Sequence, residues 1–224
     1  MLHKVDRFGQ ISGPLILFLV IFLPGYLYQS AESAAQSLST PSSLLLNLVI
    51  GIPQVFLLLF VMLANSQAAA YGLSGLKLRG IPRIFAILGG IVLLSAIASL
   101  LSRALGTESL GFIGTIELDL RDLPNIILLA LVCLTTGYKE ELFFRSYMFV
   151  DLVAVGQKEY TAAAISALFF SIGHIYEGIA SFLGTLVIGG FLAWCFTKTR
   201  NIHLLAIAHA LYNFGIIIGI SFFK

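Results

Sequence analysis

Residues 138–149, YKEELFFRSYMF, place charged side chains in a segment that is otherwise apolar. On a helix, Glu141 and Arg145 are four residues apart with the acid first, so they can form a buried, bidentate ion pair. Glu140 points about 100° away from Glu141, since a helix has 3.6 residues per turn. Glu140 therefore has no partner on its own helix, and a free carboxylate at that depth is suited to general acid or base chemistry. The alternative is a solvated helix end, because Lys139 lies beside the pair.

A second polar group lies in residues 169–178, FFSIGHIYEG. We expect His174 inside an apolar helix, with Phe170 one turn earlier and able to stack on the imidazole. Such a histidine is either catalytic or a hydrogen-bonded packing residue. Glu177 follows three residues later, but it falls at a predicted turn, where exposure to solvent explains its charge.

A third group lies in residues 208–214, AHALYNF. His209 and Asn213 are four residues apart and share a face of the predicted helix. Two neutral hydrogen-bonding side chains on one face of an apolar helix indicate a common polar target. The alternative is hydrogen bonding between helices in the membrane.

Together these groups would supply a carboxylate, two imidazoles and an amide to a site shared by three helices. Hydrolysis of an acyl bond needs a base that activates water and donors that stabilise the oxyanion. The sequence contains no H-E-x-x-H and no G-x-S-x-G motif, which are signatures of zinc and serine hydrolases. Cys133 lies two turns before Glu140, but its own segment has no base that could activate a thiol.

The composition is that of a membrane protein: of 224 residues, 58% are apolar and 11% charged, against about 45–50% and about 25% in soluble domains. The net charge of +2 offers no basic surface for nucleic acid. Cys133 and Cys195 lie in separate apolar segments and indicate neither a disulfide framework nor a metal site.

The hydropathy pattern predicts an all-α, polytopic transmembrane helix bundle that forms one integral membrane domain over residues 1–224. A spanning helix needs roughly 20 mostly apolar residues. Seven segments qualify: 11–30, 42–64, 83–101, 124–150, 160–177, 178–196 and 201–222. Residues 65–82 and 102–123 are long and partly apolar, which leaves room for an eighth span or a re-entrant segment.

The distribution of basic residues predicts the orientation. With the N-terminus inside, eight basic residues fall in inner segments and three in outer ones, as the positive-inside rule requires. The first span has a basic start like a signal peptide, but its apolar run is longer than such segments have, so we expect a retained helix.

The three motifs, in this order, resemble the CAAX-protease and bacteriocin-processing family of intramembrane proteases (CPBP, also called Abi), which includes the type II CAAX prenyl endopeptidase. The family pattern is E-E-x-x-x-R, then F-x-x-x-H, then H-x-x-x-N. This chain has EELFFR at 140–145, FSIGH at 170–174 and HALYN at 209–213. The motif-bearing part is about 124–222. Ser146 departs from the pattern, because many members have glycine after the arginine.

The resemblance implies an endopeptidase with a role for each motif residue. Glu140 would activate water with His174, His209 and Asn213 would stabilise the oxyanion, and Glu141 and Arg145 would support the site. No cofactor is implied. One alternative is a zinc site formed by Glu140, His174 and His209, with Glu141 as the base. Another is a carrier that uses buried Glu and His for proton coupling.

The resemblance also implies the partners, which are membrane lipid and a hydrophobic or lipid-modified peptide or protein, without nucleic acid. The chain is short and has no obvious eukaryotic extension, so we expect an integral protein of a prokaryotic plasma membrane.

Overall fold

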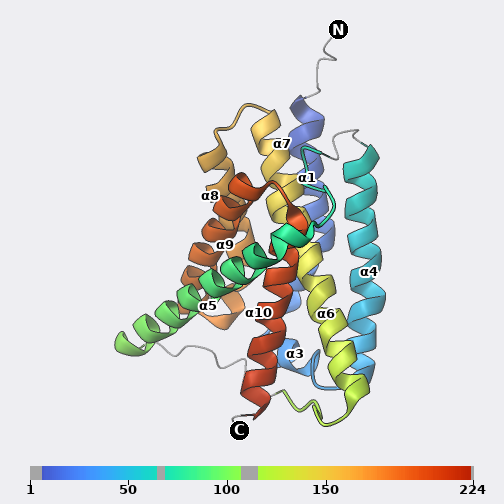
Figure 1. The fold of residues 1–224 in the computed structure, drawn as a ribbon, viewed down its shortest axis with the longest axis vertical. Coiled ribbons are helices and arrows are strands. Elements are labelled where there is room, and N and C mark those ends of the chain that lie inside the picture. The colour runs from blue at the N-terminus through green and yellow to red at the C-terminus, as the bar shows by residue number, and fades with distance from the viewer. Residues whose placement is uncertain (1–6, 65–68, 107–115, 223–224) are drawn as a thin grey trace.

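The computed structural model describes residues 7–64, 69–106 and 116–222. Within these ranges the chain is all-α and contains no strand, as the sequence predicts. Figure 1 shows a bundle in which α5 runs obliquely across the other long helices. The helices are α1 (Arg7–Ile21), α2 (Leu23–Tyr28), α3 (Ala31–Gln36), α4 (Pro41–Ala64), η1 (Leu78–Gly80), α5 (Ile81–Ala104), α6 (Leu123–Glu141), η3 (Leu142–Met148), α7 (Phe149–Ala154), α8 (Glu159–Ile172), η4 (Ile175–Glu177), α9 (Ile179–Thr199) and α10 (Ile202–Phe222).

Each of the seven predicted spans contains helix, but the described residues hold four helical segments long and apolar enough to cross a membrane: Pro41–Ala64, Leu78–Ala104, Ile179–Thr199 and Ile202–Gly219. Apolar stretches Ser12–Ile21 and Glu159–Ile172 are shorter. The count of seven spans therefore stays a prediction. Of the two segments with room for an eighth span, residues 69–77 and 116–122 contain no helix, and 65–68 and 107–115 lie outside the described residues.

The fourth predicted span is helical throughout, but its middle is not α-helix. Residues 142–148 form a π-helix, η3, between α6 and α7, and all seven of its side chains are buried. In a π-helix the backbone hydrogen bonds join residues five apart, instead of four apart as in an α-helix. Such turns are frequent at functional sites. Helix α6 therefore ends at Glu141, so the two carboxylates close the α-helix and Arg145 lies in the π-helix.

Helices α6 and α10 approach each other closely at Gly137. A Cβ atom there would lie 2.7 Å from the backbone oxygen of Ala206 and 3.1 Å from the backbone nitrogen of Ala210. Glycine lets the two backbones come this near, as small residues do at helix contacts in membranes. The contact lies about one turn from Glu140 and Glu141, so it brings the carboxylates beside the His209 turn of α10.

Helices α8 and α9 are also packed through small residues. A Cβ on Gly189 of α9 would lie 3.2 Å from the Cα of Ala167 on α8. Small residues allow this kind of close contact between helices in membranes. It places the end of α8, and the turn that follows, next to α9 and the bundle interior.

Helix α8 ends at Ile172, five residues before the predicted end of the fifth span at 177. Gly173 follows, and a Cβ there would lie 2.4–2.6 Å from the ring of Tyr26 on α2. The turn continues through η4 and closes at Gly178, whose φ of 101° suits glycine. His174 was expected inside the helix, and this was wrong: it lies in the turn, because the low helix propensity of Gly173 and the tight packing of Tyr26 end α8 before it.

The first two helices pack into the bundle rather than lying beside it. Phe22 contacts the rings of Phe143 and Phe144 in η3, with ring centroids 4.8 Å and 4.9 Å apart. Phe18 contacts Phe169 of α8 at 4.9 Å. The segment that resembles a signal peptide in its basic start therefore packs in the core, against the first motif and beside the second.

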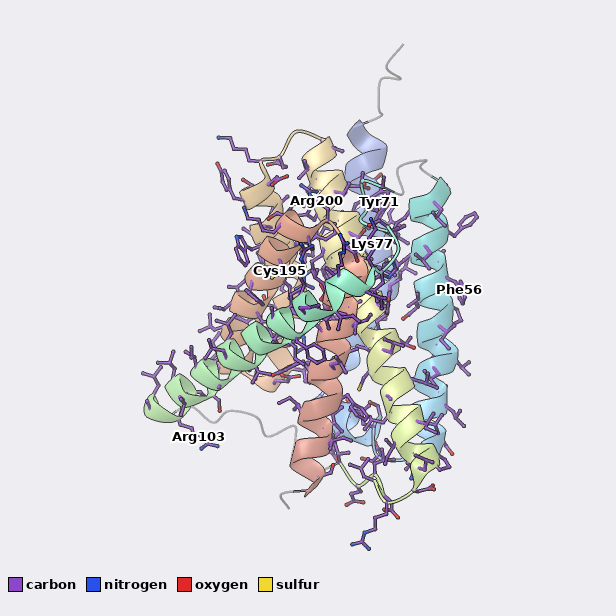
Figure 2. The ribbon with its side chains drawn as sticks, in the orientation of Figure 1. Phe56, Tyr71, Lys77, Arg103, Cys195 and Arg200 are labelled. Carbon is purple, nitrogen blue, oxygen red and sulfur yellow. The ribbon has the colours of Figure 1, made fainter. Side chains whose placement is uncertain are left out.

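The outer face of the bundle is apolar, and Phe56 on α4 points away from the other helices (Figure 2) with 66% of its surface exposed. Lys77 and Arg200 lie near one end, whereas Arg103 lies at the far end of α5 (Figure 2). The positive-inside pattern assigns the first two to one side and Arg103 to the other. Which end faces the cytoplasm stays a prediction.

Candidate active site

A buried chain of ionic contacts links the first and third motifs. The Nη1 atom of Arg145 lies 3.0 Å from Oε1 of Glu141, and both side chains are fully buried. The same Oε1 atom lies 2.9 Å from Nδ1 of His209 on α10. The guanidinium also stacks on the ring of Phe170, 4.2 Å from its centroid. The ion pair expected from the sequence is present, through one close contact rather than two, and Glu141 additionally holds His209.

Glu140 lies on the other side of the same imidazole. Its Oε2 atom is 3.7 Å from Nε2 of His209, and 19% of its side chain is exposed. The two carboxylates point in different directions because consecutive helix residues are about 100° apart. One of them is enclosed with Arg145, and the other is left with access to the interior space beside α6.

His174 is held by its own turn. Its Nδ1 atom lies 3.3 Å from Oε1 of Glu177, with 28% and 12% of the two side chains exposed. Phe170 contacts its ring edge to face, with centroids 5.3 Å apart, as the sequence predicts. Within the described residues, His174 forms an ion pair with Glu177 and none with Glu140.

These side chains line one cavity of about 360 Å³. Glu140 comes from α6, His174 from the turn after α8, and His209 and Asn213 from α10. Glu141 and Arg145 are packed behind the wall and do not line it. The rest of the wall mixes apolar and small polar residues, among them Ile91, Ser95, Ala98 and Ser99 of α5 and Ala180, Ser181, Gly184 and Thr185 of α9.

Several cavity residues were not expected from the sequence. Glu177 was interpreted as a solvated turn residue, but it lines the cavity and contacts His174. Its spacing of three residues from His174 was the available signal. Tyr26 and Gln29 of α2 also line the cavity, and Gln29 donates to the hydroxyl of Tyr176 at 3.1 Å. No motif pointed to α2, because its contribution depends on packing against a distant turn.

The zinc alternative requires at least three ligand side chains grouped around one point. In the part of the chain that the structure describes, no three His, Cys, Asp or Glu side chains are grouped to hold a metal ion. The Nδ1 atoms of both His174 and His209 face carboxylates. Glu141, the base in that alternative, does not reach the cavity. Cys133 lines the cavity wall as a buried free thiol.

Two further positions of the first motif have defined environments. Lys139 lies over the ring of Phe22, 5.6 Å from its centroid, and lines a smaller pocket between α4 and α6. Ser146, where many relatives have glycine, is buried and its hydroxyl donates to the backbone oxygen of Tyr71. The departure from the family pattern thus ties η3 to the segment after α4.

Comparison with protein families gives a match over the part of the chain that carries the motifs. Residues 122–215 match the family model described as type II CAAX prenyl endopeptidase Rce1-like. Neither a curated protein nor a solved structure matches the chain. The matched region contains every residue of the three motifs. Over residues 122–215 the chain is therefore similar to the CAAX protease (CPBP) family.

Proposed function

We propose that the protein is an intramembrane endopeptidase that hydrolyses a peptide bond of a hydrophobic or lipid-modified substrate. The observation that carries the proposal is the convergence of Glu140, His174, His209 and Asn213 on one cavity. Three separate segments contribute, and the carboxylate that an arginine neutralises is excluded from the cavity. The family match supports the same class of reaction.

The residues divide into those that activate water and those that stabilise charge. Glu140, with His174, removes a proton from a water molecule as its oxygen bonds to the carbonyl carbon. The resulting oxyanion accepts hydrogen bonds from His209 and Asn213. When the C–N bond breaks, the leaving amine takes the proton that the base had accepted. Glu140 is suited to the first step because it has no cationic partner on its own helix.

The contacts of the two ring nitrogens of His209 determine which nitrogen can donate a hydrogen bond to the oxyanion. In the proposed mechanism, Oε1 of Glu141, which also contacts Arg145, accepts a hydrogen bond from Nδ1–H of His209. Donation from Nε2 as well requires the doubly protonated ring. Carboxylate oxygens lie 2.9 Å from Nδ1 and 3.7 Å from Nε2 of this ring. A charged donor forms a stronger hydrogen bond to an oxyanion than a neutral one.

The test is cleavage by purified protein in proteoliposomes, with a lipid-modified fluorogenic peptide as substrate. Glu140→Gln keeps the shape of the side chain but removes the base, and we expect a loss of at least about 10²-fold in kcat. Glu117→Gln is the matched control, since Glu117 is exposed in the loop before α6. Full cleavage by the Glu140→Gln variant would overturn the assignment.

The same preparation tests the two alternatives. Zinc dependence predicts bound metal in washed protein and loss of cleavage on chelation, whereas the proposed mechanism predicts chelator-resistant cleavage. A proton-coupled carrier predicts solute flux without cleavage in the same liposomes. These outcomes are read independently of the Glu140→Gln result.

A further inference from the structure

A second carboxylate, Glu177, lines the same cavity as Glu140 and contacts His174. It lies in η4, outside the helices that carry the first and third motifs. Only 12% of its side chain is exposed, so its position is not explained by solvation. A buried carboxylate needs partners, and Glu177 has His174 at 3.3 Å together with hydrogen bonds to the side chains of Tyr176 and Ser181.

The two imidazoles of the cavity have the same arrangement. Nδ1 of His209 is held by Glu141 at 2.9 Å, and Nδ1 of His174 is held by Glu177 at 3.3 Å. A carboxylate that accepts from Nδ1–H fixes the tautomer and orientation of the ring, which leaves Nε2 to act on a substrate. For a neutral His174, Nε2 is then a proton acceptor, as base assistance requires.

The conformation of the turn holds the side chains of His174 and Glu177 next to each other. Gly173 packs against Tyr26, whose ring leaves no space for a Cβ, and Gly178 closes the turn at a φ of 101°. The backbone nitrogen of Glu177 also bonds to the carbonyl oxygen of His174 at 3.1 Å. His174 and Glu177, three residues apart in the sequence, are therefore held in contact.

We propose that Glu177 is the positioning residue of His174: it holds the Nδ1–H tautomer and stabilises the imidazolium that forms when His174 takes a proton. This rests on the proposed proteolytic function. Glu177 touches no reacting atom. Glu140 and Nε2 of His174 together take the proton of water, which later passes to the leaving amine, and Nδ1–H stays in place throughout.

The test compares Glu177→Gln with Glu177→Asp in the proteoliposome cleavage assay, with Glu117→Gln as control. We expect Glu177→Gln to lower kcat on the order of 10–100-fold, the usual effect of removing such a supporting partner, with KM within about twofold. Glu177→Asp, which retains the carboxylate on a shorter side chain, should restore part of the kcat.

The pH profile separates positioning from a structural role. Other ionisable groups around His174 are Glu140 from α6, Arg145 from η3, Tyr26 from α2, His209 from α10 and Tyr176 on its own turn. None of them changes in the variant. Loss of the adjacent negative charge should move the acidic limb of kcat/KM to lower pH in Glu177→Gln, because burial lowers the pKa of His174 whereas the contact with Glu177 raises it.

The proposal is overturned by a Glu177→Gln enzyme with wild-type kcat, or by one whose lower kcat comes with an unmoved acidic limb. Neither result touches the proteolytic function, which fails only if the wild type does not cleave or Glu140→Gln cleaves fully. Nitrogen-15 spectra of labelled His174 give a readout independent of activity: the Nδ1–H tautomer should dominate in the wild type and lose that dominance in Glu177→Gln.

Discussion

Replacing Gly137 by alanine should damage the active site without altering any residue in it. The added Cβ would lie 2.7 Å from the backbone oxygen of Ala206, about 0.7 Å closer than ordinary contact. Because that atom belongs to the backbone of α10, no side chain can move aside, so α6 and α10 must separate. Overpacking of this kind costs about 1–3 kcal/mol.

The separation acts on the 2.9 Å contact between Glu141 and His209, which joins the same two helices within about one turn of Gly137. A displacement approaching 1 Å at a catalytic group lowers the rate by about 10²-fold. We therefore expect Gly137→Ala to lose between about tenfold and 10²-fold in kcat and to unfold at lower temperature in detergent.

Gly215→Ala is the matched control on α10, because nothing lies within 4 Å of its Cβ position. Alanine is favoured over glycine inside a helix by up to about 1 kcal/mol, so this variant should be as stable as the wild type or more so. The same substitution thus has opposite effects at the two sites. If Gly137→Ala were as stable and as active as Gly215→Ala, the close approach would not be what positions the site.

Two further variants probe the buried supports, each measured by unfolding in detergent beside the cleavage assay. Arg145→Met leaves the enclosed carboxylate of Glu141 without its cation, which should cost about 3–5 kcal/mol, so an unfolding midpoint equal to the wild type would contradict the buried ion pair. Ser146→Ala removes the hydrogen bond to the backbone of Tyr71 and should cost about 1 kcal/mol with cleavage within twofold. Unchanged stability of that variant would show that the hydroxyl does not hold the segment after α4.

The parts of the site that follow local periodicity could be predicted from the sequence. The pairing of Glu141 with Arg145 depends on a four-residue spacing, and it survives the change from α- to π-helix between them. The shared face of His209 and Asn213 depends on the same spacing, and both line the cavity. These relations lie within one segment, so hydropathy and helical geometry are sufficient.

The parts that depend on contacts between distant segments could not be predicted. The end of α8 at Ile172 depends on Tyr26, nearly 150 residues earlier, packing against Gly173. That ending moves His174 from a helix into a turn and turns Glu177 inward. From sequence alone, a glutamate beside a glycine in a turn is expected to be exposed to solvent. The sequence does not tell which distant helix covers that turn.

The pairing of carboxylates with imidazoles also depends on the third dimension, and it changes what each glutamate is for. Adjacent glutamates on a helix diverge by about 100°, so a single arginine on that helix can serve one of them. An imidazole has nitrogens on opposite edges, and His209 uses them to face Glu141 with Nδ1 and Glu140 with Nε2. Glu141 thereby contacts Arg145 and His209 at once, which fixes its position. Glu140 has the longer contact, at 3.7 Å, and access to the cavity. This difference in surroundings, rather than the identity of the residues, is why we propose Glu140 as the carboxylate that takes part in catalysis.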